Sequence, residues 1–168
     1  NLESNRGVEA TPVVIDGVMY VTASWSIVHA IDVRTGQKLW SFDPKVDRSA
    51  GYKGCCDVVN RGVAVWKGRV FVASYDGRLI ALDAATGKEV WRFDPAPHNG
   101  GRIFRGRNRG VTYWEDEHGR NQRIFAFVRD RVYAIDAKTG VLIEPFGQDG
   151  GQFIDLRRDL PVRSELAD

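Results

Sequence analysis

Residues 30–40 read A-I-D-V-R-T-G-Q-K-L-W, and residues 81–91 repeat the pattern as A-L-D-A-A-T-G-K-E-V-W. A third copy, A-I-D-A-K-T-G, begins at Ala134 and has Glu144 at the position of the tryptophan. A second marker, N-R-G-V, precedes each copy, at residues 5–8, 60–63 and 108–111. Two markers that recur three times in the same order indicate a protein built from three internal repeats.

Each repeat is composed of short strands. The stretch V-V-I-D-G-V-M-Y (residues 13–20) contains two β-rich runs separated by Asp-Gly, and V-W-K-G-R-V-F-V (residues 65–72) repeats it with Lys-Gly, so both predict hairpins. The D-x-x-T-G pattern predicts a further turn, in which aspartate and threonine oxygens accept backbone N–H bonds and glycine adopts a positive φ. Four strands in about 50 residues are typical of one blade of a β-propeller. The sequence therefore predicts an all-β fold of four-stranded antiparallel blades, with Trp40 and Trp91 packed between neighbouring blades.

The repeats also predict the organisation of the chain. We expect blade units at about residues 5–50, 60–97 and 108–150, followed by a polar tail at residues 151–168. Three blades do not close a ring, because propellers typically have about 4–8 blades. We therefore expect a segment of a longer protein, with assembly from several chains as the alternative. Glu144 indicates that the third unit packs against something different or changes register.

Composition excludes several classes of protein. The 168 residues carry 24 Lys+Arg and 22 Asp+Glu, a net charge of +2, which argues against a nucleic-acid-binding protein. The hydrophobic fraction of 43% is that of a globular chain, and the apolar runs are much shorter than a membrane-spanning helix. The three histidines, His29, His98 and His118, have no metal-site spacing, so we expect no metal ligands among them.

Cys55 and Cys56 are the only cysteines and are adjacent. They cannot link distant parts of the chain, and a zinc site needs more ligands at other spacings. Two interpretations remain, a pair of reduced thiols or a vicinal disulfide. The second forms a strained ring of a kind that usually persists only where function requires it.

The segment G-C-C-D-V-V-N-R-G-V-A-V-W (residues 54–66) resembles the signature of the quinoprotein dehydrogenases, which use pyrroloquinoline quinone (PQQ). The A-x-D-x-x-T-G-x-x-x-W copies are similar to the blade-docking motif of the same family. The resemblance is close over residues 1–95 and looser over residues 102–160, which are more similar to the glucose dehydrogenase branch. It implies an eight-bladed propeller with PQQ on the axis, of which this chain would supply about three blades.

The resemblance assigns cofactor-binding roles to four residues, and the internal repeat adds Arg109 as a fifth candidate. It implies a vicinal disulfide between Cys55 and Cys56 on one face of PQQ, and an arginine, Arg61, that meets the acidic groups of PQQ. A guanidinium suits a carboxylate because the two form paired hydrogen bonds. Arg109 occupies the same repeat position as Arg61, and Glu9 corresponds to a glutamate that hydrogen-bonds the quinone. The alternatives are an inter-strand ion pair for Arg61 and a solvated carboxylate for Glu9.

Other parts of the active site of this family have no match in the chain. The resemblance places the calcium-binding glutamate, the catalytic aspartate and a tryptophan that stacks on PQQ outside these residues, and the C-x-x-C-H haem motif is absent. We therefore expect no catalytic residue and no metal ligand within this chain, and an incomplete active site.

The implied function is that of a segment of a periplasmic PQQ-dependent dehydrogenase that oxidises an alcohol or a sugar. The implied cofactors are PQQ and Ca²⁺, and the implied partners are the remaining blades and a cytochrome or membrane quinone as electron acceptor. A disulfide would agree with the oxidising periplasm. The alternative is a non-catalytic propeller that acts as a scaffold for protein–protein interaction, for which an adjacent cysteine pair would have no purpose.

Overall fold

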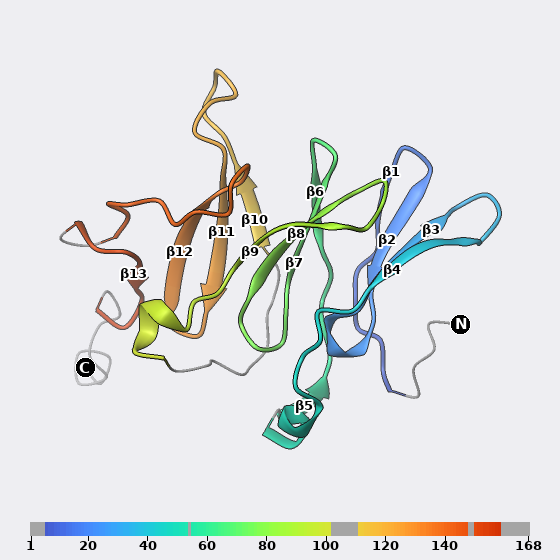
Figure 1. Ribbon diagram of the computed structural model, residues 1–168, viewed down its shortest axis with the longest axis horizontal. Helices are drawn as coiled ribbons and strands as arrows, with labels where there is room; N and C mark the ends of the chain where they lie inside the picture. The colour runs from blue at the N-terminus through green and yellow to red at the C-terminus, as the bar shows by residue number, and fades with distance from the viewer. Residues whose placement is uncertain (1–5, 54, 102–110, 148–149, 159–168) are drawn as a thin grey trace, which may run out of the picture.

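The computed structural model describes residues 6–53, 55–101, 111–147 and 150–158, with the side chains of all of these except residues 50, 52, 53, 55 and 56. The described residues form three four-stranded antiparallel sheets, which stand side by side (Figure 1). No α-helix occurs in the described ranges, where the helical elements are short 3-10 turns. The all-β prediction of four-stranded antiparallel blades is confirmed.

The three sheets follow one another along the chain, and in each the strands pair in chain order. Sheet 1 contains β1 (Val13–Ile15), β2 (Val18–Thr22), β3 (Val28–Asp32) and β4 (Lys38–Phe42). Sheet 2 contains β6 (Ala64–Trp66), β7 (Arg69–Ala73), β8 (Leu79–Asp83) and β9 (Glu89–Phe93). Sheet 3 contains β10 (Val111–Trp114), β11 (Arg123–Val128), β12 (Arg131–Asp136) and β13 (Ile154–Asp155).

The predicted turns occur where the sequence places them. Ile15 pairs with Val18 across Asp16-Gly17, and both turn residues have positive φ, which matches the twist of a two-residue hairpin. In the D-x-x-T-G turn of sheet 2, the backbone N–H and hydroxyl of Thr86 both donate to Asp83 Oδ1. The backbone N–H groups of Thr35 and Thr139 donate to Asp32 and Asp136 in the same way, so these local bonds fix the turn that follows the third strand of each sheet.

The sheets pack through the alternation of side chains along the strands of sheet 2. One face of β7 and β8 packs on sheet 1 through Val70, Val72, Ile80 and Leu82. The opposite face packs on sheet 3 through Phe71, Ala73, Leu79 and Ala81. Both faces of β7 and β8 are therefore buried, which explains why these two central strands are apolar at nearly every position.

A tryptophan of each of the first two sheets packs on a glycine of the next sheet, a contact that we call the tryptophan latch. The indole of Trp40 lies on Gly87 of sheet 2, and its Nε1–H donates to the carbonyl oxygen of Ala84 at 2.9 Å. In the same way Trp91 lies on Gly140 of sheet 3 and donates to the oxygen of Ala137 at 3.1 Å. A Cβ atom at either glycine would lie 2.6 Å from the indole ring, so the contact requires glycine. Trp91 is buried and Trp40 is partly buried between the sheets, in agreement with the sequence prediction.

Sheet 3 ends differently from the other two. After Ile143, whose N–H donates to Ala134, the chain leaves β12 and returns only at β13. The fourth strand therefore lies within residues 151–168, which the sequence analysis assigns to a polar tail. The ring of Phe146 packs 5.7 Å from that of Phe125. Phe125 occupies the repeat position of Tyr20 and Phe71, whose rings pack on Trp40 and Trp91. Phe146 thus supplies the aromatic contact that Glu144 cannot make.

A polar link joins sheets 2 and 3 near the β6–β7 turn. Glu115 Oε2 accepts hydrogen bonds from Lys67 Nζ and from the Tyr113 hydroxyl, both at 2.8 Å. The lysine, followed by the tyrosine, lowers the pKa of Glu115. Burial, followed by the bond to Glu115, raises the pKa of Tyr113 to about 12.

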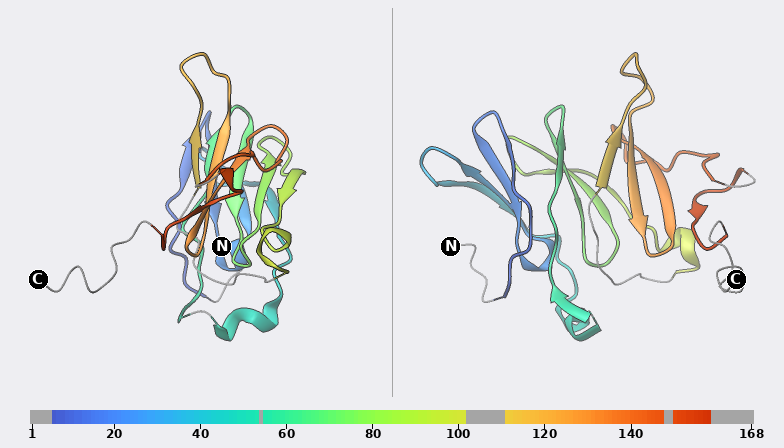
Figure 2. Two further views of the ribbon diagram at one scale, coloured as in Figure 1. Left: turned by 90° about the vertical axis from the view of Figure 1, so that its left-hand side faces the viewer. Right: turned by 180° about the vertical axis from the view of Figure 1, so that it is seen from behind.

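Between sheets 1 and 2 the chain makes an excursion, residues 43–60, which we call the cysteine segment. It contains the 3-10 turn η2 (Arg48–Lys53) and the short strand β5 (Cys55–Val58). Figure 2 shows this segment projecting beyond the same end of the sheets in both views. The turns η1 (Ser24–Ser26) and η3 (Pro97–Asn99) complete the described secondary structure.

Candidate functional site

Glu9 and Arg61, both predicted to bind the cofactor, form an ion pair. Arg61 Nη2 lies 3.1 Å from Glu9 Oε2, and the two side chains are 46% and 44% exposed. The predicted alternative for Arg61, an ion pair, is therefore present. Because a guanidinium has five N–H donors and this contact uses one nitrogen, Arg61 keeps donors that an added carboxylate can accept.

Backbone contacts hold the two charged residues together. The N–H of Thr11 donates to the carbonyl oxygen of Arg61 at 3.2 Å. Gly62, with φ of 130°, lies so close to Thr11 that a Cβ atom would be 2.9 Å from its carbonyl oxygen. The glycine of the N-R-G-V marker therefore lets the segments before sheets 1 and 2 approach each other.

The asparagine of the same marker is a buried structural residue. Asn60 Nδ2 donates to Ser26 Oγ at 3.0 Å and to the carbonyl oxygen of Ala73 at 2.8 Å. Its Oδ1 accepts the N–H of Gly62 at 3.0 Å. Asn60 thus fixes the chain immediately before Arg61. Repetition of the marker indicates that the asparagine matters, but not which groups it bonds.

The side chains of three other predicted site residues lie outside what the structure describes. The backbone of Cys55 and Cys56 forms the start of β5, but their side chains are outside the description, so the disulfide stays a prediction. Arg109 lies outside the described residues and likewise stays a prediction.

A cationic cluster that sequence reasoning missed lies around Trp25. The guanidinium groups of Arg6 and Arg48 lie 5.7 and 4.6 Å from the centre of its ring, distances typical of cation–π contacts. Arg6 also pairs with Asp57, the residue that follows the cysteines. Trp25, Ser26 and Asp57 all have positive φ, between 61° and 64°, an uncommon conformation that often marks functional segments. The only sequence signal is that Arg6 occupies the same repeat position as Arg61.

The described ranges show neither a metal-binding cluster nor a membrane-spanning helix. They contain no group of three or more histidine, cysteine, aspartate or glutamate side chains arranged to hold a metal ion. The ring nitrogen Nδ1 of His98 lies 3.2 Å from Gln152 Oε1, and that of His29 lies 3.1 Å from Ser41 Oγ, which gives each a structural contact. No helix among these residues is long and apolar enough to cross a membrane.

The fold and this site define a class of protein, the β-propellers whose sheets are joined by tryptophan latches. The profile described as "PQQ: Glucose/ethanol/alcohol dehydrogenase, beta-propeller domain" matches residues 1–70 and 66–167. The chain belongs to this family, and the resemblance inferred from the cysteine motif is confirmed.

Relatives agree with this assignment. The chain is 55% identical over 152 residues to a quinohemoprotein alcohol dehydrogenase of Comamonas testosteroni, covering 83% of this chain and 20% of that protein. It is 69% identical over 91 residues to a 1-butanol dehydrogenase (cytochrome c) of Thauera butanivorans, covering 54% of this chain and 13% of that protein. The chain therefore spans about a fifth or less of the length of these relatives.

Solved structures give the same picture. The crystal structure of the Comamonas testosteroni enzyme has a TM-score of 0.70 at 53% identity, covering 84% of this chain and 21% of that one. A europium-containing methanol dehydrogenase has a TM-score of 0.66 at 32% identity, covering 84% of this chain and 25% of that one. BamB from Moraxella catarrhalis has a TM-score of 0.51 at 20% identity and covers 80% of this chain and 33% of that one, a likeness that concerns the fold alone.

Proposed function

We propose that the chain forms part of the propeller of a PQQ-dependent alcohol dehydrogenase and contributes part of its cofactor face. The observation that carries the proposal is the half-exposed pair of Glu9 and Arg61, of which Arg61 directly follows the cysteine segment. Two relatives of the chain support the proposal, because they are named as a quinohemoprotein alcohol dehydrogenase and a 1-butanol dehydrogenase. We therefore favour an alcohol over a sugar as the substrate.

The residues of this chain fit the chemistry of PQQ, a planar tricarboxylate. Arg61 would bind one carboxylate and orient the ring system, because a guanidinium forms paired bonds with a carboxylate. Glu9 would hold Arg61 in place and accept a hydrogen bond from the cofactor. Cys55 and Cys56, joined as a vicinal disulfide, would cover one face, and Arg109 would serve as a second cationic contact. When bound, PQQ supplies the two-electron acceptor for alcohol oxidation.

The rest of the site would come from outside the chain. A Ca²⁺ or lanthanide ion, its ligands and the catalytic base belong in our proposal to further blades of the same propeller. The acceptor of the electrons would be a cytochrome or a membrane quinone, and the compartment the periplasm, where a disulfide persists. We do not favour a non-catalytic scaffold, because that function leaves the adjacent cysteines and the neighbouring charged pair without a role.

The proposal is tested on a longer protein that carries this chain together with the remaining blades. PQQ binding would be followed by fluorescence quenching, with and without Ca²⁺ or a lanthanide, and oxidation of ethanol and 1-butanol by reduction of an artificial dye. We expect binding and alcohol-dependent dye reduction only when both PQQ and the metal ion are present. A folded protein that binds no PQQ would contradict the proposal, and activity on glucose alone would contradict the choice of substrate.

A further inference from the structure

The turn between β7 and β8, residues 74–78, has an internal polar network. Arg78 Nε lies 2.9 Å from each carboxylate oxygen of Asp76, and its Nη2 lies 2.6 Å from Asp76 Oδ2. The hydroxyl of Ser74 donates to the same carboxylate at 2.5 Å. The Arg78 and Asp76 side chains are only 13% and 19% exposed, so this pair is more protected than the Glu9–Arg61 pair. The network holds the guanidinium in one orientation.

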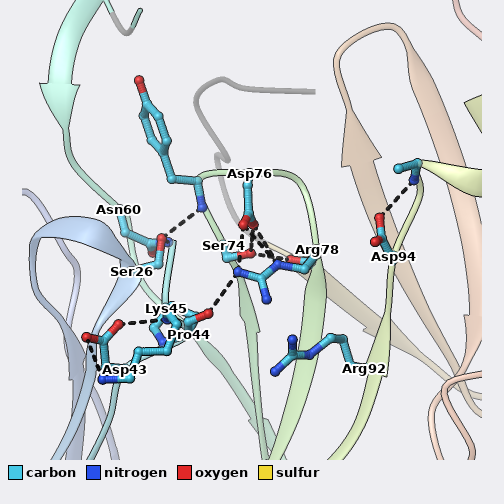
Figure 3. Close-up of polar contacts among 12 residues, drawn as sticks. Ser26, Asp43, Pro44, Lys45, Asn60, Ser74, Asp76, Arg78, Arg92 and Asp94 are labelled. Carbon is cyan, nitrogen blue, oxygen red and sulfur yellow. Dashed lines mark hydrogen bonds and ion pairs between the residues drawn. The ribbon is translucent and has the colours of Figure 1, made fainter. Parts of the chain in front are cut away.

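That orientation directs Arg78 at the base of the cysteine segment. Its Nη2 donates to the carbonyl oxygen of Pro44 at 2.8 Å, as Figure 3 shows. Pro44 is buried and lies where the chain leaves sheet 1. The bond therefore ties the start of the cysteine segment to sheet 2, across the junction of the two sheets.

The same turn also holds the end of the cysteine segment. Ser26 Oγ accepts both the N–H of Tyr75 and the amide of Asn60, each at 3.0 Å. The side chains of Val46, Val58 and Tyr75 form a small buried cluster beneath the segment. Both ends of the cysteine segment and two of its apolar side chains are thus attached to residues 74–78 or to their direct partners.

We propose that Arg78 is a positioning residue that orders the cysteine segment and so sets the place of Cys55 and Cys56 relative to Arg61. The part of this inference that concerns PQQ binding by the cysteine segment rests on the proposed function. The attachment of the segment to residues 74–78 does not depend on it. The guanidinium is suited to the task because it bonds a carboxylate and a carbonyl at once in a fixed plane. An ammonium group carries the charge but does not supply that planar arrangement.

Arg92 provides a matched control. It also belongs to sheet 2 and also pairs with an acidic residue, Glu89, at 2.6 Å. Both members of that pair lie within β9, and Figure 3 shows Arg92 beside the Arg78 network with no dashed contact to it. Replacement of Arg92 therefore removes an arginine–carboxylate pair of the same sheet and, although the charge of Arg92 also acts on Asp76, leaves the bond from Arg78 to Pro44 in place.

The first experiment measures hydrogen exchange of the chain and its variants by mass spectrometry. Arg78→Ala should raise the exchange rates of residues 45–53 and 55–58 by about tenfold or more, because their local opening no longer breaks the bond to Pro44. Arg78→Lys should give a smaller increase, and Arg92→Ala should leave this segment unchanged. Faster exchange spread equally over all three sheets would overturn the proposal, since Arg78 would then contribute only to global stability.

The second experiment measures PQQ affinity in the longer protein, well below its unfolding temperature. Arg78→Ala should raise the dissociation constant about tenfold or more, Arg78→Lys should give an intermediate value, and Arg92→Ala should match the wild type. Unchanged affinity in Arg78→Ala, despite faster local exchange, would overturn the positioning role. A wild-type protein that binds no PQQ would overturn the proposed function instead, and the exchange experiment would still decide whether Arg78 anchors the segment.

Discussion

Arg61 lies 3.1 Å from Glu9, although Glu9 precedes sheet 1 and Arg61 precedes sheet 2. The contact joins the entry segments of two successive sheets at a half-exposed site. An ion pair of such exposure stabilises a fold by less than about 1 kcal/mol, so its effects on stability and on ligand binding are separable.

The first prediction concerns Arg61. In the chain itself, Arg61→Ala should change the free energy of unfolding by less than about 1 kcal/mol, measured by urea denaturation. In the longer protein the same change should weaken PQQ binding by about 3–5 kcal/mol, because it leaves a carboxylate of the cofactor unpaired in a site with little water. Arg61→Lys should also bind poorly, since an ammonium lacks the planar fork.

Arg6→Ala is the control for Arg61. Arg6 occupies the same repeat position but pairs with Asp57 and lies against Trp25, so its loss should alter stability more than PQQ affinity. Equal PQQ affinity in the wild type and in Arg61→Ala would reject the cofactor role of Arg61.

The second prediction uses three equivalent glycines. Gly36, Gly87 and Gly140 have φ of 71°, 70° and 73°, so Gly→Ala costs each about 1–2 kcal/mol of backbone strain. At Gly87 and Gly140 the new methyl group also meets an indole at 2.6 Å, whereas at Gly36 nothing described lies within 4 Å. Thermal unfolding should therefore show a further loss of about 1–3 kcal/mol at Gly87 and Gly140 only. Equal losses at all three positions would contradict the prediction, because the indole would then move away from the new methyl group without loss of stability.

The third prediction concerns the buried Asn60. Asn60→Ala removes the donor to Ser26 and Ala73 in a buried region and should destabilise the chain by about 2–3 kcal/mol in urea denaturation. Ser49→Ala serves as a surface comparison, because that exposed hydroxyl donates to the nearby Asp47, and should stay within about 0.5 kcal/mol of the wild type. A similar effect of both changes would contradict the structural role of Asn60.

The fourth prediction concerns pH. The pKa of Tyr113 is raised to about 12 in the folded chain, above the value of about 10 for an unfolded tyrosine. The neutral phenol therefore contributes stability below pH of about 10, and this contribution is lost as the pH rises from about 10 to about 12. Ultraviolet difference absorbance should detect a late-titrating tyrosine that disappears in Tyr113→Phe. Glu115→Gln should lower the pKa of Tyr113 only in part, because burial is the larger cause.

The fifth prediction concerns the cysteines. If Cys55 and Cys56 form a vicinal disulfide, oxidised protein should contain no free thiol and should gain roughly 2 Da on reduction, one hydrogen for each sulfur. Intact mass spectrometry with and without reductant tests this directly. Two reactive thiols in unreduced protein would remove the disulfide from the proposed site.

The elements that were predictable from the sequence are those fixed by local chemistry. Asp16-Gly17 and Asp83-x-x-Thr86-Gly87 determine their turns through bonds between near neighbours, and Trp40 and Trp91 recur at the end of a repeat. The attachment of Arg78 to Pro44 was not predictable, because it joins two sheets through a backbone carbonyl that leaves no mark on residue type. The displaced fourth strand of sheet 3 was missed for a related reason, since Ile154–Asp155 is too short to show an alternating pattern.

The site divides in the same way. Glu9 and Arg61 were identified as site residues by motif and resemblance, but their pairing depends on how the entry segments cross at Gly62. Arg48 escaped notice because its contact with Trp25 depends on the positive φ of that tryptophan, which the residue type does not indicate.

The tryptophan latch makes the first and last sheets of the chain different, because in the described part of the chain sheet 1 has a glycine without a tryptophan on it and sheet 3 ends without a tryptophan. In sheet 1, Gly36 is the equivalent of Gly87 and Gly140, on which Trp40 and Trp91 lie. No described atom lies within 4 Å of a Cβ atom at Gly36. In sheet 3, Phe146 makes the aromatic contact that the tryptophans make in the other sheets, but a phenyl ring has no N–H to donate to a neighbouring carbonyl oxygen. If Phe146 met Gly36 of a second copy, the contact would therefore lack the hydrogen bond that Trp40 and Trp91 donate. In the longer protein that we propose, we expect the tryptophan that contacts Gly36 to come from another blade, so that these contacts help to set the order of the blades around the ring.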